Sequence, residues 1–277
     1  NMAHIELPAP DSAIVAGRDA IVADLVRLLG AAYVVADDDG RRAFETDALT
    51  AYRRMPLAVV LPRSTEDVSR VLRYCHERGI KVVPRGAGTS LCGSALPAED
   101  AVVVCISKMS RVLDIDYESR CARVESGITN LAISAAVGDK GFFYAPDPSS
   151  QIACTLAGNL AMNSGGAHCL KYGVTTNNVL GVRMVLITGE VVHIGGAHLD
   201  ADGYDWLALI VGSEGTLAFV ASVTFETVEL PVVTTTAWLH FPDIQTAVDP
   251  VPELVAAGAT AVELMVAPAP ITAGWDM

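Results

Sequence analysis

The densest group of residues that could bind a ligand is the glycine-rich segment from Pro84 to Gly93. It reads PRGAGTSLCG and follows an apolar run at residues 80–83. Glycine allows a positive φ and lets another molecule approach the backbone closely, and successive N–H groups in such a loop can form an anion-binding concavity. Thr89 and Ser90 would add hydroxyl donors. The segment predicts either a cradle for a pyrophosphate or a glycine-rich surface turn after a strand, because short motifs also arise by chance.

Four further groups have the small, polar character of a ligand-binding wall. They are residues 145–150 (APDPSS), 154–159 with 163–166 (CTLAGN and NSGG), 171–173 (KYG) and 212–217 (GSEGTL). Each group alone could be a loop whose polar atoms bond to one another. Their recurrence along one chain favours a shared binding role.

Alternating strands and helices are expected to position the glycine-rich segment. Ser64, three residues before Asp67, is typical of the start of a helix. The patterns predict a strand at residues 57–62, a helix at 65–78, and strands at 80–83 and 101–106. This order predicts a small, mostly parallel α/β unit.

The pattern changes after residue 110 and predicts a second, mainly antiparallel α+β unit. The expected elements are hairpins at 112–124 and 179–194, a helix at 130–140 and a strand at 217–228. A helix at residues 12–30 precedes both units. After Pro231 a strand at 234–241, a helix at 244–257 and a strand at 260–266 are expected. A lone strand–helix–strand unit leaves its edges uncovered, so the chain is expected to stop partway through a domain.

Composition limits the classes of partner. The 277 residues suggest about two domains, and a net charge of −13 without a basic stripe argues against nucleic acid. The longest uncharged stretch, residues 148–170, is too rich in Gly, Asn and Ser for a transmembrane helix. The first residues lack the charged and apolar regions of a signal peptide, so none is expected. These features indicate a cytoplasmic protein.

The six cysteines and six histidines show no metal-binding spacing. There is no CxxC, HxH or HExxH pattern. We therefore expect reduced, mostly buried thiols and no metal site.

Taken together, PRGAGTSLCG, PDPSS, NSGGAHCLKYG and GSEGTLAFV resemble the flavin-binding domain of the vanillyl-alcohol oxidase / p-cresol methylhydroxylase (PCMH) superfamily. Within it the chain is most similar to the FAD-linked oxidases of 2-hydroxy acids. These are the large subunit of glycolate oxidase, the D-lactate dehydrogenases and the D-2-hydroxyglutarate dehydrogenases. The resemblance covers residues 50–266.

The resemblance implies an α+β fold: a PCMH-type FAD-binding domain of two subdomains, followed by the start of a ferredoxin-like α+β cap domain that is cut short. The expected parts are an N-terminal helical segment (1–54), the FAD-binding domain (55–230, with subdomains of about 55–110 and 111–230) and the beginning of the cap (231–277). FAD would lie between the two subdomains.

The resemblance also assigns residues to the cofactor. The pyrophosphate would be held, largely through main-chain N–H groups, by Pro84, Arg85, Gly86, Ala87, Gly88, Thr89, Ser90 and Gly93. The adenosine–ribityl arm and the isoalloxazine would lie along Pro146, Asp147, Ser149, Ser150, Thr155, Gly158 and Asn159. The same cleft would be lined by Ser164, Gly165, Gly166, Tyr172 and Gly173. The adenine end would be closed by Glu214, Gly215 and Val220.

Two features of the glycine-rich segment refine the cofactor. It lacks GxGxxG, and Cys92-Gly93 follow in place of a helix, which argues against a Rossmann NAD site. Some superfamily members tether FAD through a histidine in this loop. Residues 88–91 contain none, so a bound FAD should be non-covalent. His168 and Cys169 are either a packing pair at a helix end or direct flavin contacts.

The expected reaction is the oxidation of a small 2-hydroxy acid (glycolate, D-lactate or D-2-hydroxyglutarate) to the 2-oxo acid, with a hydride passing to flavin N5. In the relatives an arginine of the cap and a histidine-bound metal handle the substrate, and neither can be placed within residues 1–277. The catalytic residues are therefore unknown. The alternative is a flavin-binding module or subunit without turnover of its own, because the catalytic residues of the cap domain are absent. The expected partners are a small 2-hydroxy-acid substrate and an electron-acceptor partner subunit.

Overall fold

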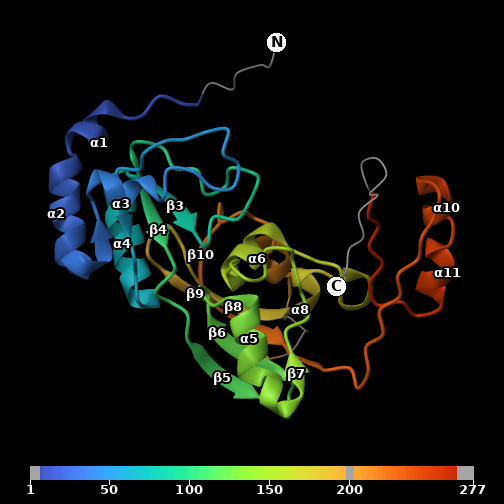
Figure 1. Cartoon of the computed structure of the whole chain (residues 1–277). Coiled ribbons are helices and arrows are strands. Elements are labelled where there is room, and N and C mark those ends of the chain that lie inside the picture. The colour runs from blue at the N-terminus through green and yellow to red at the C-terminus, as the bar shows by residue number, and fades with distance from the viewer. Residues whose placement is uncertain (1–6, 198–202, 267–277) are drawn as a thin grey trace.

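The structure is a computed structural model that describes residues 7–197 and 203–266 (Figure 1). Its first sheet has four strands in the order β1-β2-β4-β3. They are β1 (Val34–Val35), β2 (Ala58–Val60), β3 (Lys81–Arg85) and β4 (Ala101–Cys105). The last three run parallel, and β1 pairs antiparallel with β2. The predicted, mostly parallel unit is confirmed.

Helix α4 (Thr65–Glu77) links β2 to β3 and begins where the sequence predicts. The Ser64 side chain accepts a hydrogen bond from the Asp67 N–H at 3.2 Å and caps the helix. Its buried face carries Val68, Val71 and Leu72, which join the first hydrophobic cluster. The amphipathic spacing of the helix therefore covers one face of the parallel strands.

The N-terminal segment, residues 7–54, contains more and shorter helices than predicted. The expected helix at 12–30 forms as α1 (Ser12–Ala16) and α2 (Arg18–Leu29), which meet at Gly17. A further short helix, α3 (Asp38–Arg42), follows. Asp37 caps it by accepting a hydrogen bond from the Gly40 N–H at 2.8 Å, which satisfies one of the N–H groups that a helix leaves unpaired at its start. The segment also contributes β1 to the first sheet, which sequence patterns had not indicated.

The second sheet is antiparallel, with the order β5-β6-β10-β8-β9. Its strands are β5 (Val112–Asp116), β6 (Cys121–Glu125), β8 (Val179–Val185), β9 (Val191–Gly195) and β10 (Phe219–Glu226). Both predicted hairpins and the long strand are confirmed. A small pair, β7 (Phe142–Phe143) with β11 (Val228–Glu229), lies beside it.

Short helices lie in the part of the chain that forms the second sheet, and Figure 1 labels α5, α6 and α8 among them. They are α5 (Asn130–Val137, extended by a 3-10 turn at Gly138–Lys140), α6 (Leu156–Met162), α7 (Cys169–Tyr172), α8 (Thr175–Asn178) and α9 (Trp206–Ile210). Ile133 of α5 and Leu156 and Leu160 of α6 share the second hydrophobic cluster with Val223 and Phe225 of β10. The expected helix at 130–140 is confirmed, and the core fixes α6 against β10.

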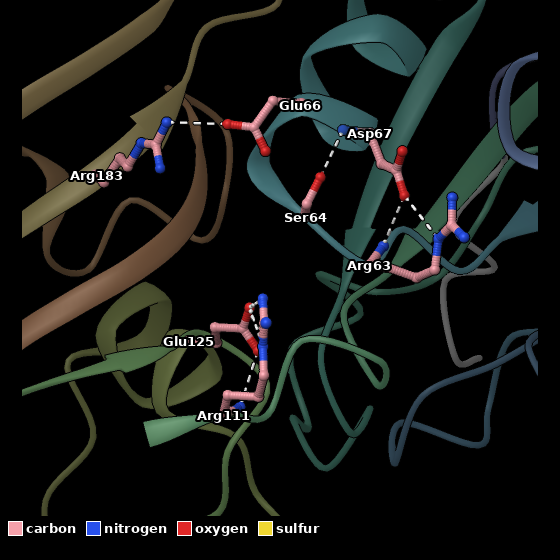
Figure 2. A network of polar contacts seen from close by, with 7 residues as sticks. All are labelled: Arg63, Ser64, Glu66, Asp67, Arg111, Glu125 and Arg183. Carbon is pink, nitrogen blue, oxygen red and sulfur yellow. Dashed lines mark hydrogen bonds and ion pairs between the residues drawn. The ribbon is translucent and has the colours of Figure 1, made fainter. Parts of the chain in front are cut away.

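The two sheets meet in the first hydrophobic cluster. Val185 of β8 and Phe219 and Ala221 of β10 belong to the first hydrophobic cluster together with α2 and α4. Polar contacts cross the same junction, where Arg183 Nη2 lies 3.2 Å from Glu66 Oε1 (Figure 2). The two sheets are therefore held in a fixed relation.

The described residues after Pro231 differ from the prediction. The expected helix at 244–257 forms as α10 (Ile244–Val248) and α11 (Val251–Ala256), with Pro250 between them, because proline clashes with the preceding turn and lacks an N–H. The strands expected at 234–241 and 260–266 are wrong, since these residues are irregular. Strands need paired neighbours to satisfy their backbone groups, and none lies beside them in residues 231–266. The remainder of the expected cap, residues 267–277, lies outside the described residues.

All six cysteines are free thiols, and four of them are buried, as the sequence predicts. Across residues 7–197 and 203–266, no helix is both long enough and apolar enough to cross a membrane.

Candidate functional site

A cleft of about 300 Å³ lies where the glycine-rich segment meets α6 and the loop before β10. The glycine-rich segment leaves the end of β3, at the carboxyl edge of the parallel strands. In α/β sheets ligands bind at that edge. The topology therefore places the segment where a ligand can reach it.

Arg85 anchors the segment from behind. Its side chain is buried, and its Nη1 donates to the carbonyl oxygen of Thr46 at 2.7 Å and to that of Ala95 at 3.4 Å. Burial lowers the pKa of Arg85, while nearby Cys105 and Asp47 act in the opposite direction. The guanidinium thus bonds to the protein's own carbonyl groups. Arg85 is also the one basic residue among the described residues that line the cleft.

Several main-chain N–H groups of the segment have no acceptor among the described residues. No main-chain N–H of residues 87–90 donates to another part of the described chain, and Ala87 and Thr89 are exposed. A turn with unused N–H groups suits an acceptor-only group such as a pyrophosphate. Pro84 has no N–H, and its ring lies against Gly215.

Gly86 is required by a close approach to the start of α6. A Cβ built at Gly86 would lie 2.4 Å from Thr155 Oγ1. Thr155 caps α6 by accepting a hydrogen bond from the Gly158 N–H at 3.2 Å. Only glycine lets the segment pass this threonine, so the two halves of the cleft wall touch here.

Helix α6 supplies the wall opposite the glycine-rich segment. Asn159 is buried at the cleft, and its Nδ2 donates to Asn130 Oδ1. At the far end of α6, Met162 Sδ lies 3.8 Å from the hydroxyls of both Ser90 and Ser94. The helix therefore contacts the segment at both ends.

The loop before β10 closes the third side. The Gly212 N–H donates to the carbonyl of Leu160, and the Glu214 N–H donates to that of Ala161, both at 2.8 Å. Glu214 has a positive φ of 54°, a conformation that costs a side-chain-bearing residue energy and persists only where its surroundings hold it. The loop is fixed to the last turn of α6.

The structure brings together fifteen of the residues predicted from the sequence. Those that line the cleft are Pro84, Arg85, Gly86, Ala87, Gly88, Thr89, Ser90, Ser150, Thr155, Gly158, Asn159, Ser164, Glu214, Gly215 and Val220. Eight predicted residues are not among its lining residues, namely Gly93, Pro146, Asp147, Ser149, Gly165, Gly166, Tyr172 and Gly173.

Several of these eight form a neighbouring polar cluster. His168 Nδ1 lies 2.7 Å from Asp147 Oδ2, and the His168 N–H donates to Asp147 Oδ1 at 3.2 Å. A Cβ at Gly166 would lie 2.0 Å from the Asp147 carbonyl oxygen. The ring of Tyr172 packs edge-on against Phe143. These residues determine the conformation of the loop beside the cleft, and His168 belongs to this cluster through its two contacts with Asp147.

The rest of the lining is mostly apolar or sulfur-bearing. Part of it lies within the motifs quoted from the sequence but was not assigned to the cofactor, namely Leu91, Cys92, Cys154, Ala157, Ser213, Ala218 and Phe219. Sequence reasoning missed Ser94, Ala95, Ile106, Leu160, Ala161 and Met162. The signal that could have found Met162 is its spacing three residues after Asn159 on one helix face. Within the described residues, no group of three or more His, Cys, Asp or Glu is placed to hold a metal ion.

Comparison with known proteins agrees with this geometry. Residues 56–195 match the family described as FAD binding domain. Glycolate oxidase subunit GlcD of Escherichia coli (strain K12) is 45% identical over 215 residues, covering 78% of this chain and 43% of the relative. D-lactate dehydrogenase of Archaeoglobus fulgidus is 35% identical, covering 78% of this chain and 49% of the relative. The chain thus spans less than half the length of these relatives.

A solved structure of alkyldihydroxyacetonephosphate synthase shares the fold, with a TM-score of 0.69 and 23% identity over 84% of this chain and 43% of that chain. The resemblance to the FAD-linked oxidases of 2-hydroxy acids is confirmed by the relatives. The mixed α+β fold, the glycine-rich cleft and the matched family agree: the chain belongs to the family of FAD binding domains, and its cofactor is FAD.

Proposed function

We propose that this chain is the FAD-binding part of an oxidoreductase that converts a small 2-hydroxy acid, such as glycolate, D-lactate or D-2-hydroxyglutarate, into the 2-oxo acid. The observation that carries the proposal is the cleft, in which unused N–H groups of residues 87–90 lie across from α6. The relatives named glycolate oxidase subunit and D-lactate dehydrogenase support the substrate class.

The proposed roles of the residues follow from their chemistry. The N–H groups of the glycine-rich segment would bind the pyrophosphate, Arg85 would hold that segment in place, and the polar wall of α6 would contact the sugar and ring. When bound, FAD supplies the hydride acceptor. Residues 55–230 would form this unit, and residues 231–277 would belong to a cap. No catalytic residue is assigned within this chain.

FAD is proposed to bind without a covalent link, since residues 88–91 contain no histidine. A relative named as a subunit also favours an electron-acceptor partner subunit for the whole enzyme.

The first test is the visible absorption spectrum of the purified chain, repeated after acid precipitation. We expect flavin bands that move into the supernatant. A colourless protein that takes up no added FAD would overturn the site, and bands that stay in the pellet would overturn non-covalent attachment. In an enzyme that also contains the cap, anaerobic addition of glycolate, D-lactate or D-2-hydroxyglutarate should then bleach the bands for the true substrate.

A further inference from the structure

Two buried asparagines determine the chemical character of one wall of the cleft. Asn130 and Asn159 are each 1% exposed, and Asn159 lines the cleft. An asparagine side chain carries an acceptor oxygen on one side and a donor nitrogen on the other. Whichever atom of Asn159 faces the cleft decides which ligand groups it can bind.

The orientation of both side-chain amides follows from the Pro146 carbonyl group, with which Asn130 forms a hydrogen bond. The carbonyl oxygen of Pro146 can only accept, so Asn130 must turn its Nδ2 toward it, and the bond measures 2.8 Å. Asn130 Oδ1 then points the other way and accepts from Asn159 Nδ2 and from Cys154 Sγ. Burial raises the pKa of Cys154, so its thiol keeps the proton that it donates. Reversing either amide would leave buried polar atoms without partners, which is costly.

The backbones that carry the two asparagines are also fixed. An isolated antiparallel bridge between Thr129 and Thr155 joins the starts of α5 and α6, and each threonine caps its own helix. The Asn159 carbonyl accepts from the Ser164 N–H at 2.8 Å. Neither asparagine can therefore turn with its helix.

We propose that Asn130 is a positioning residue that holds Asn159 with Oδ1 toward the cleft, so that Asn159 recognises a hydrogen-bond donor of the cofactor; this inference rests on the proposed function. FAD has three kinds of donor: the ring imide N–H, the sugar hydroxyls and the adenine amino group. Its phosphate oxygens, ring carbonyls and remaining ring nitrogens only accept. Asn159 thus binds the ring, a sugar or the adenine, while the pyrophosphate is left to the glycine-rich segment.

The test combines ligand analogues with substitutions, measuring the dissociation constant by quenching of flavin fluorescence. The analogues are 3-methyl-FAD, FAD with single sugar hydroxyls replaced by hydrogen, and FAD with unsubstituted purine in place of adenine. With the unchanged protein, one analogue should bind about tenfold more weakly than FAD. In Asn159→Leu that difference should vanish, because the partner of the missing donor is gone.

Asn130→Ala tests positioning. Without Asn130 the Asn159 amide can rotate. The ratio of dissociation constants between the sensitive analogue and FAD should therefore fall, while the same ratio for the other analogues stays unchanged. If Asn130 only stabilised the fold, its loss would weaken the binding of FAD and of every analogue by the same factor. The melting temperature of the FAD-free protein checks folding, and Asn159→Ala replaces the leucine variant if the latter does not fold.

The outcomes separate the two proposals. If the unchanged protein binds no FAD, the proposed function fails. If it binds FAD and every analogue equally, or if the same analogue penalty persists in Asn159→Leu, the site stands and the role of Asn159 is overturned.

Discussion

At the scale of single residues, Gly86 decides whether the two walls of the cleft can meet. The Gly86→Ala substitution places a Cβ 2.4 Å from Thr155 Oγ1, so either the glycine-rich segment or the first turn of α6 must move. We expect the free energy of unfolding to fall by about 1–3 kcal/mol and FAD to bind more weakly. Urea denaturation and a fluorescence titration measure the two effects.

Gly138→Ala is the matched control for this prediction. Gly138 has a helical φ of −67°, and a Cβ there would meet nothing within 4 Å, so stability should be unchanged or slightly raised. Equal stability of the two variants would show that the contact between Gly86 and Thr155 does not constrain the cleft.

At the scale of elements, Asp67 ties the start of α4 to the chain before it. Its carboxylate accepts hydrogen bonds from the N–H and Nε of Arg63, both at 3.1 Å (Figure 2). It also accepts one from Arg70 Nη2 at 2.5 Å. Burial alone would raise the pKa of Asp67, but these hydrogen bonds outweigh it and hold the pKa below its ordinary value. The charged form is therefore the one that stabilises the fold.

Asp67→Asn should lower the free energy of unfolding at neutral pH by about 1–3 kcal/mol. Because the pKa is depressed in the folded state, this stabilisation is complete above about pH 4 and is lost as the pH falls through the folded pKa. The difference between the variant and the unchanged protein should accordingly narrow in acid, as measured by urea denaturation at several pH values. Asp19→Asn, also in a first helical turn but with a fully exposed side chain, should show no such trend. A constant difference for Asp67→Asn at all pH values would contradict the argument.

Elements with local signals could be predicted from the sequence, and those that depend on partners could not. Ser64 and Asp67 mark the start of α4 within four residues. Strand β1 forms because β2 lies beside it, and the strand expected at 234–241 has no such neighbour in the described part of the chain. In the same way, the glycine-rich segment could be recognised as a site, whereas Ile106, which belongs to no polar motif, reaches the cleft only because β4 pairs with β3.

At the scale of the whole molecule, the first hydrophobic cluster draws on both sheets. Val185 and Phe219 lie in it with Leu25 and Val71 from the N-terminal half. Since the cleft lies between these halves, the shared core keeps its walls at a constant separation. The cleft is thus a product of the complete arrangement, although the motifs that line it are local.

Because the Arg85 side chain is bonded to carbonyl groups in the interior, we can predict how the binding of FAD should depend on ionic strength. With that guanidinium bound to carbonyl groups, the proposed pyrophosphate would be met by fixed backbone dipoles at contact distance, which dissolved ions screen poorly. The net charge of −13 meanwhile repels an anionic cofactor at long range, and salt weakens that repulsion. Raising the salt concentration should therefore leave the dissociation constant of FAD unchanged or lower it, as a fluorescence titration would show. A steep loss of affinity would mean that mobile surface cations hold the phosphates. If the proposal holds, neutral peptide groups would bind a doubly charged ligand in this chain.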